Sequence, residues 1–280
     1  MLNIGSYNEL VVKSKATIGL YLHDGDESVL LPARYVPQDA KVGDVLNVFV
    51  YLDNENRPVA TTLKPNALLG DFAFLKVKDV TQHGAFLDWG IAKDLFVAHQ
   101  EQRTEMQIGQ KYLVHLFMDD FSGRIAATSK WGKYVDKDTD ELAEGDEVQL
   151  LIAEETEIGF KAIINNRYEG LLYRNEIFQP LKVGDAKTGF IKFVREDGKV
   201  DITLQKQGFK NVLDTKDMIL QKLKEANGIL ELGDKSSPED ISNTLHISKK
   251  VFKKTIGTLF KDRLITVRDY EIRLVDQLGE

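Results

Sequence analysis

The sequence predicts a mainly β protein, with three tandem five-stranded barrels followed by a small α+β domain. Three observations predict this class. A set of glycine and apolar positions recurs three times, strand-like patterning fills each repeat, and helical periodicity replaces it after Lys210. The expected units cover residues 1–66, 67–134 and 140–210, with the last domain over 211–280.

Glycines anchor the repeat. Gly43, Gly109 and Gly184 lie in the similar segments KVGDVLNVFV, QIGQKYLVHL and KVGDAKTGFI. A branched aliphatic residue follows each of them by 16 positions, and a Leu or Phe precedes each by 13. A further glycine lies 11 or 12 residues before that Leu or Phe in every copy. Such constant spacing indicates one supersecondary plan used three times.

Each repeat has the composition of β-strands. Its segments mix branched and aromatic residues with polar ones, and an internal glycine predicts a bulge or bend that helps a barrel to close. The last two strands of each unit are expected to form hairpins through the turns DNENR, DDFSG and REDG. Five short strands in such a length are typical of the Greek-key OB-type barrel.

The middle unit resembles the S-one domain, an RNA-binding OB module named after a small-subunit ribosomal protein. The resemblance rests on four segments: Lys76–Val80, His83–Leu87, Asp94–Val97 and Arg124–Ser129. It implies an OB barrel that binds RNA by stacking aromatic side chains on bases.

The stacking set of that family is diluted in this chain. His83 stands where the family has an aromatic residue before the glycine, and Val97 replaces the turn histidine. The first unit keeps only Tyr21 at the main stacking position. The third has Lys161 where the stacking phenylalanine is expected and Tyr173 at the histidine position.

After Lys210 the pattern is helical. A helix is expected after Asp214, with Met218, Ile219 and Leu223 on one face, and Gly228 is placed to end it. The segment ILELGD has the composition of a short strand, and Ser237-Pro238 is a helix start.

The following segment predicts a capped helix and a two-stranded wing. Ser248 is placed to cap a helix over 249–261. Its expected apolar face is Val251, Phe252, Ile256, Leu259 and Phe260. LITVRDYEIRLV predicts a hairpin that turns at Arg268-Asp269. This order of elements resembles a winged helix-turn-helix.

Helix 249–261 is strongly basic opposite its apolar face, with candidate phosphate-binding residues Lys249, Lys250, Lys253 and Lys254. Like charges four residues apart destabilise a helix by a few tenths of a kcal/mol, and a phosphate backbone would reverse that cost. In a winged helix this is the usual recognition element. The alternative is an ordinary solvated face.

The domain order as a whole resembles the bacterial conserved virulence factor B family, whose members join tandem S-one domains to a C-terminal winged helix. The resemblance implies RNA binding and post-transcriptional regulation.

Candidate RNA-binding residues also lie in the second and third units. Phe86 and Trp89 are the candidates for base stacking in the second unit, although Phe86 could instead point into its barrel. The third unit combines cations with an aromatic ring, as single-strand grooves do. Its candidates are Lys161, Arg167, Tyr173, Arg174, Lys192, Arg195 and Lys199.

The charge distribution is uneven. The net charge is −7, which argues mildly against nucleic acid. Residues 136–157 hold ten acidic residues and one basic, whereas 161–210 hold ten basic and six acidic, a net charge of +4. The third unit is therefore expected to be the main RNA surface of the barrels, joined to the basic helix.

Several function classes are not expected. With no cysteine, no signal-peptide pattern and no long apolar run, we expect a cytoplasmic protein with no membrane partner. The five histidines lack metal-ligand spacing, and no phosphate-binding loop or nucleophile motif occurs. We therefore expect no catalysis, cofactor, metal or small-molecule substrate.

Single-stranded RNA is the expected partner, because OB modules bind unstacked bases. Two alternatives remain open: a DNA-binding transcription regulator that acts through the winged helix, and an adaptor that binds the ribosome or other proteins.

Overall fold

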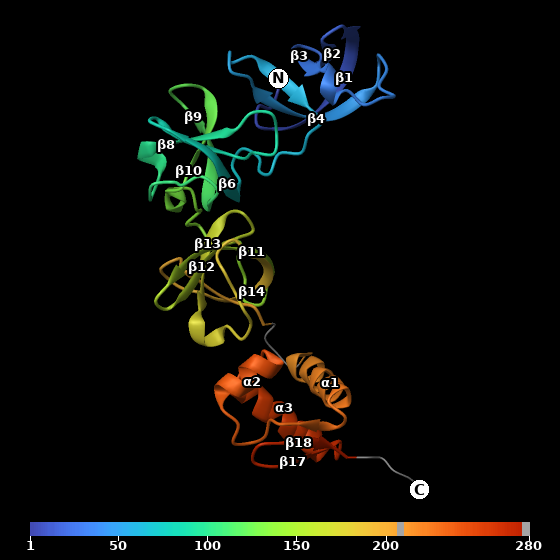
Figure 1. Ribbon diagram of the computed structural model, residues 1–280, viewed down its shortest axis with the longest axis vertical. Helices are drawn as coiled ribbons and strands as arrows, with labels where there is room; N and C mark the ends of the chain where they lie inside the picture. The colour runs from blue at the N-terminus through green and yellow to red at the C-terminus, as the bar shows by residue number, and fades with distance from the viewer. Residues whose placement is uncertain (206–209, 276–280) are drawn as a thin grey trace. The chain divides into compact units, whose positions relative to one another are not determined.

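The computed structural model describes residues 1–205 and 210–275 (Figure 1). The chain divides into two compact units, Met1–Val135 and Asp136–Glu280. Three five-stranded β-units occupy the chain up to residue 205, and the α-helices of the described residues all lie after residue 209. The predicted fold class is confirmed.

The first β-unit is a closed barrel with the strand order β1-β2-β3-β5-β4. Its strands are β1 (Ser6–Ala16), β2 (Gly19–His23), β3 (Ser28–Pro32), β4 (Val45–Leu52) and β5 (Pro58–Thr61). The parallel pairing of β3 with β5 closes it, and the other neighbours are antiparallel. This order is that of the OB barrel.

The third β-unit repeats this topology as a closed barrel, β11-β12-β13-β15-β14. Its strands are β11 (Glu147–Thr156), β12 (Gly159–Ile164), β13 (Tyr168–Tyr173), β14 (Ala186–Val194) and β15 (Val200–Thr203). β13 and β15 pair in parallel, as their counterparts do in the first barrel.

The second β-unit has the same order but stays open. Its strands are β6 (Phe72–Thr81), β7 (Gly84–Leu87), β8 (Leu95–Ala98), β9 (Lys111–Asp119) and β10 (Arg124–Thr128). The sheet order is β10-β9-β6-β7-β8, so the pairing of β8 with β10 that would close the barrel is missing among the described strands. One end of this seam is bridged where Glu101 O accepts from Ser129 N at 3.0 Å and from Thr128 Oγ1 at 3.1 Å.

The repeated glycines have a common steric cause. At Gly19, Gly84 and Gly159 the backbone has φ of +147°, +152° and +154°, and a Cβ would lie 2.0–2.2 Å from a carbonyl oxygen of the next strand. Only glycine permits this approach. The other repeated glycines, with φ of +85° to +95°, donate to the first strand where it bulges. These bonds join Gly43 to Val12, Gly109 to Val77 and Gly184 to Ile152.

The first and second barrels share a hydrophobic core. Phe49 and Tyr51 on β4 belong to the same buried cluster as Trp89 and the interior of the second barrel. The Phe49 and Trp89 rings meet edge to face, with their centroids 5.5 Å apart. This packing holds the two barrels as one unit.

The C-terminal domain has the predicted winged-helix elements. They are α1 (Lys210–Glu225), β16 (Ile229–Leu230), α2 (Pro238–Leu245), α3 (Lys249–Lys261), β17 (Ile265–Val267) and β18 (Ile272–Leu274). Ser237 and Ser248 cap α2 and α3 as predicted: their side chains accept from Asp240 N at 3.0 Å and Val251 N at 3.2 Å. The two wing strands pair around the expected turn.

Two local predictions in this domain were wrong. α1 begins at Lys210 rather than after Asp214, because no glycine or proline interrupts the segment and the helix continues towards its N-terminus. Phe260 was expected on the buried face of α3, but it is 56% exposed because it lies beyond the edge of the apolar stripe.

The unit limits predicted at 66/67, 134/140 and 210/211 stay predictions. The last strands of the three β-units end at Thr61, Thr128 and Thr203. The stretches 206–209 and 276–280, which the predicted domains include, lie outside the described residues.

Candidate nucleic-acid interface

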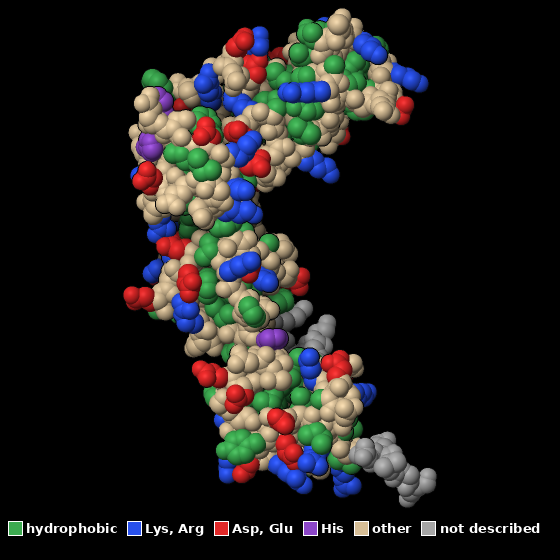
Figure 2. Space-filling model, viewed as in Figure 1, with side chains coloured by type: hydrophobic (Ala, Val, Ile, Leu, Met, Phe, Trp, Pro, Cys, Tyr) green, Lys and Arg blue, Asp and Glu red, His purple; other side chains and the backbone are tan. Residues whose placement is uncertain are grey.

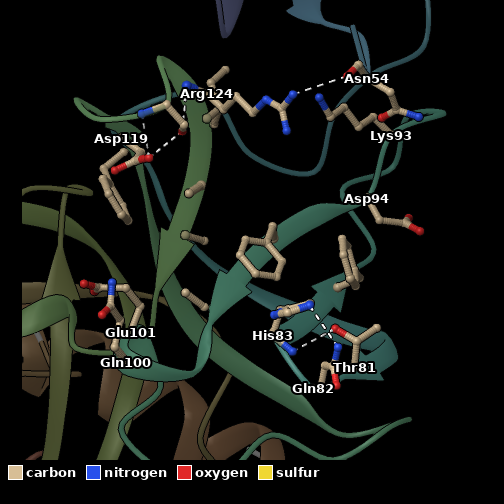
Figure 3. Close-up of a pocket in the computed structure, with 18 of the residues that line it drawn as sticks. Asn54, Thr81, Gln82, His83, Lys93, Asp94, Gln100, Glu101, Asp119 and Arg124 are labelled. Carbon is tan, nitrogen blue, oxygen red and sulfur yellow. Dashed lines mark hydrogen bonds between the residues drawn. The ribbon is translucent and has the colours of Figure 1, made fainter. Parts of the chain in front are cut away.

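A hollow of about 890 Å³ lies on the outer face of the second barrel. Residues of β7, β8 and β10 line it, so it follows the seam where β8 and β10 are not paired. It also receives Asn54 from the first barrel, in the turn between β4 and β5. Figure 3 shows the polar residues of its rim.

Three phenylalanine rings line this hollow, those of Phe86, Phe96 and Phe117, and the first two form a pair. Phe86 on β7 pairs in register with Phe96 on β8, and their ring centroids are 5.1 Å apart. Ala85 and Leu87, the strand neighbours of Phe86, are buried in the core. Because strand side chains alternate, Phe86 must point outward, which decides between the two orientations that the sequence left open. The two rings offer a surface on which bases can stack.

Two cations stand at the rim of the hollow. Lys93 Nζ donates to the carbonyl oxygens of Leu52 at 2.7 Å and Asp53 at 3.0 Å. Arg124 Nε donates to Asn56 Oδ1 at 2.5 Å. Burial, followed by the charge of Arg124, lowers the pKa of Lys93. Within residues 1–205 neither cation has a carboxylate partner, so both keep their charge available to an anion.

The nearby carboxylates are engaged elsewhere. Asp94, which also lines the hollow, accepts from Lys78 Nζ at 2.6 Å. Asp53 accepts from Arg57 at 2.7 Å. Two more carboxylates line the hollow: Asp119 accepts from Ser122 N at 3.0 Å, and Glu101 pairs with Lys133 at 3.4 Å. Among the described residues, none of these four carboxylates forms an ion pair with Lys93 or Arg124.

The structure corrects the stacking prediction for Trp89. Its side chain is 2% exposed, and its indole Nε1 donates to Ala67 O at 2.8 Å. Its ring packs against Phe49 instead of facing solvent. Trp89 is therefore part of the core that the first two barrels share.

The cations predicted in the third barrel all contact carboxylates. The pairs are Lys161 with Glu169, Arg167 with Asp136 and Glu141, Arg174 with Glu155, Lys192 with Glu176, Arg195 with Asp201, and Lys199 with Asp197. A phosphate at this surface would have to compete with these partners. The face shown in Figure 2 likewise mixes Lys and Arg with Asp and Glu side chains.

Tyr173 contacts two of the other RNA-binding candidates predicted in the third barrel. Its hydroxyl accepts from Arg195 Nη2, and Lys192 Nζ lies 6.0 Å from the centroid of its ring. Arg167 lies in the turn before β13 and binds Asp136 at 2.9 Å instead. The third barrel thus has one small aromatic and cationic cluster, which its ion pairs hold in place. Its role as an RNA surface stays a prediction.

The predicted lysines of α3 lie on the solvent side of that helix. Lys250, Lys253 and Lys254 are exposed and Lys249 is half-buried. Lys253 pairs with Asp234 at 3.0 Å, whereas the other three have no ion pair within residues 210–275. The buried face of α3 includes Phe252, which is fully buried. The helix therefore presents a basic face whose charge is largely uncompensated.

Sequence reasoning missed Lys93, Arg124 and Phe96 as site residues. Arg124 and Phe96 lie in segments that carry the S-one resemblance, so the family pattern could have identified them. Lys93 carries no such signal, because its position depends on contacts with the first barrel.

The described residues offer neither a metal-binding cluster nor a membrane-spanning helix. No group of three His, Cys, Asp or Glu residues in 1–205 and 210–275 could hold a metal ion. No helix in those ranges has the length and apolar character needed to cross a membrane.

The fold and the hollow define a class of protein: S1-type OB barrels joined to a winged helix, both of them nucleic-acid-binding domains. A family model described as the S1 domain matches residues 4–63 and 69–130. A second, described as the CvfB-like winged helix domain, matches residues 217–274. The chain therefore carries S1 domains and a CvfB-like winged helix domain, and proteins named Conserved virulence factor B are among its homologues.

Similar proteins cover nearly the whole chain. YitL of Bacillus subtilis (strain 168), described as uncharacterized, is 26% identical over 92% of this chain and 89% of its own. Conserved virulence factor B of Staphylococcus epidermidis (strain RP62A) is 24% identical over 97% and 94%. A crystal structure of a multidomain protein with nucleic acid binding domains from Streptococcus pneumoniae TIGR4 covers 97% of this chain and 98% of that one, with 21% identity and a TM-score of 0.43.

Proposed function

We propose that the protein binds single-stranded RNA and regulates gene expression after transcription, as a cytoplasmic binding protein rather than an enzyme. The observation that carries this proposal is the outward pair of Phe86 and Phe96 beside Lys93 and Arg124. Stacking surfaces next to phosphate-directed cations are the means by which OB barrels hold single strands. Paired bases inside a duplex cannot reach such a surface.

The basic face of α3 supplies a second contact. Lys250 and Lys254 attract phosphates without regard to sequence. Tethering this weak site to the barrels raises its effective concentration on a strand already bound. The cluster of Tyr173, Lys192 and Arg195 in the third barrel supplies a further contact. RNA phosphates replace the carboxylate partners of its two cations, and the cluster and α3 then bind the strand together.

The test is fluorescence anisotropy of the full chain with labelled single-stranded RNA and with duplex DNA, over a range of salt. We expect tighter binding of the single-stranded RNA, weakened by higher salt. Phe96→Ala should cost about 1–3 kcal/mol of binding free energy if a base stacks on that ring.

A double substitution tests the contribution of α3. Lys250→Glu with Lys254→Glu should weaken binding, whereas the same charge change at Lys222 and Lys224, exposed on α1, should weaken it much less. If both double substitutions weaken binding equally, α3 contributes only through the net charge of the chain and not through a specific contact. Tyr173→Ala tests the third barrel in the same assay.

The main competing function is duplex DNA binding through the winged helix, because α3 occupies the position of a recognition helix. Equal or tighter binding of duplex DNA would favour it. Failure to bind either nucleic acid at low salt would favour an adaptor that binds the ribosome or other proteins.

A further inference from the structure

The first barrel contributes directly to the hollow on the second. Lys93 and Arg124 belong to the second barrel, but their hydrogen-bond acceptors lie between Leu52 and Asn56 in the first. Arg124 Nη2 also donates to Asn54 O at 3.3 Å. Figure 3 shows the side chains of Arg124 and Lys93 pointing toward one another beside Asn54. One turn of the first barrel thus fixes both cations.

The acceptors in this turn are neutral. Three are backbone carbonyls and the fourth is the amide oxygen of Asn56. They orient the two like charges without cancelling them. The turn has two carboxylates, and Arg57 binds both of them. Its Nε and Nη2 donate to Asp53 at 2.9 and 2.7 Å, and its Nη1 pairs with Glu55 at 2.8 Å. Two adjacent cations repel one another, and an anion bound between them would remove that repulsion.

The neighbouring surface indicates which anion. Phe86 and Phe96 stand in the same hollow, so a group bound between the cations lies next to a surface for bases. A nucleic-acid strand offers both parts, since a phosphate separates each base from the next. A peptide of acidic residues alone would leave the phenylalanine rings without a stacking partner.

We propose that Lys93 and Arg124 together bind a phosphate of the strand, and that the turn 53–57 of the first barrel positions them. This inference rests on the proposed function and extends it, because the first two barrels then form one binding site. The first barrel acts by holding the cations, whatever its own outer face binds.

Two substitutions separate this idea from a purely structural contact. Asn56→Asp keeps the shape of the residue and its bond to Arg124, but it places a carboxylate where the amide oxygen is. Asn56 has φ of +63°, which aspartate tolerates. Lys93→Gln removes the other charge. Gln38→Glu, on an exposed residue of the first barrel, is the charge-matched control for Asn56→Asp.

The experiment measures binding of a labelled single-stranded RNA of about 12 nucleotides to the full chain, in salt from about 50 to 200 mM. We expect Asn56→Asp and Lys93→Gln each to weaken binding about tenfold at the lowest salt. Each should also make the slope of log K against log salt shallower by about 0.7, the value for one phosphate contact on a single strand. The thermal stability of Asn56→Asp should match or exceed that of the unmodified chain.

Phe96→Ala distinguishes failure of this inference from failure of the proposed function. If Phe96→Ala weakens binding while Asn56→Asp or Lys93→Gln behaves like Gln38→Glu, the paired phosphate site is wrong and single-strand binding stands. If the unmodified chain does not bind RNA at low salt, both proposals are overturned.

Discussion

Phe49→Ala in the first barrel should destabilise the second barrel. Phe49 is fully buried, and its ring contacts Tyr7, Tyr51 and Trp89 at centroid distances of 5.9, 6.3 and 5.5 Å. Loss of a buried phenylalanine costs about 3–5 kcal/mol when the surroundings do not collapse into the space. Because the two barrels share this core, we expect them to unfold together and to lose that stability together.

The chain offers a natural reporter for this effect. Both of its tryptophans, Trp89 and Trp131, lie in the segment of the second barrel and are buried. Unfolding of the full chain in urea, followed by tryptophan fluorescence, therefore reports on that barrel. With a denaturant slope of about 1–3 kcal/mol per M, a loss of about 3 kcal/mol lowers the midpoint by about 1 M or more.

Tyr21→Ala is the matched control. Tyr21 is an aromatic residue of the same barrel, but it is 37% exposed and points outward on β2. Its removal should change the fluorescence midpoint by less than about 0.5 M, since surface substitutions cost about 0.5 kcal/mol or less. Equal midpoints for Phe49→Ala and Tyr21→Ala would refute the shared core and make the barrels independent.

Three further predictions concern single residues. Gly84→Ala should prevent folding of the second barrel, since its Cβ would lie 2.2 Å from a backbone oxygen. Gly109→Ala has open space around it and should cost only about 1–2 kcal/mol of folding free energy. Circular dichroism of the two variants checks this contrast. Burial lowers the pKa of His115 to about 4, below its unfolded value of about 6.5. The stability present above pH 6.5 should therefore be lost as the pH falls toward 4, by up to about 3 kcal/mol. Urea midpoints at several pH values should show no such loss in His115→Phe, and a parallel loss in that variant would contradict the assignment. Thr255→Val should stabilise the winged helix by up to about 1 kcal/mol, because within residues 210–275 the buried hydroxyl of Thr255 has no hydrogen-bond partner; a lower melting temperature would contradict this.

Features set by nearby residues were predictable from the sequence. The caps at Ser237 and Ser248 depend on backbone groups three residues away, and the structure has both. The glycine spacing identified three copies of one barrel because each first-strand bend and each close approach recurs. Such local constraints can be recognised from the residue types alone.

Features set by distant residues were not predictable. The outward orientation of Phe86 follows from the burial of its strand neighbours Ala85 and Leu87 in the core, which no local pattern fixes. Trp89 is buried because it packs against Phe49, 40 positions earlier in the sequence. Lys93 belongs to the site through carbonyl oxygens of Leu52 and Asp53. In each case a tertiary contact assigns the role.

The distinction between local features and tertiary contacts also resolves the apparent conflict between a net charge of −7 and nucleic-acid binding. Residues 161–210 carry a formal charge of +4, but the cations predicted there contact carboxylates of the same unit, so their field at the surface is weakened. Lys93 and Arg124 lie in a chain segment without a marked excess of positive charge, yet neutral acceptors hold them. Because a phosphate responds to the uncompensated charge that it meets and not to the sum over a segment, two such cations can contribute more binding than a larger number of paired ones.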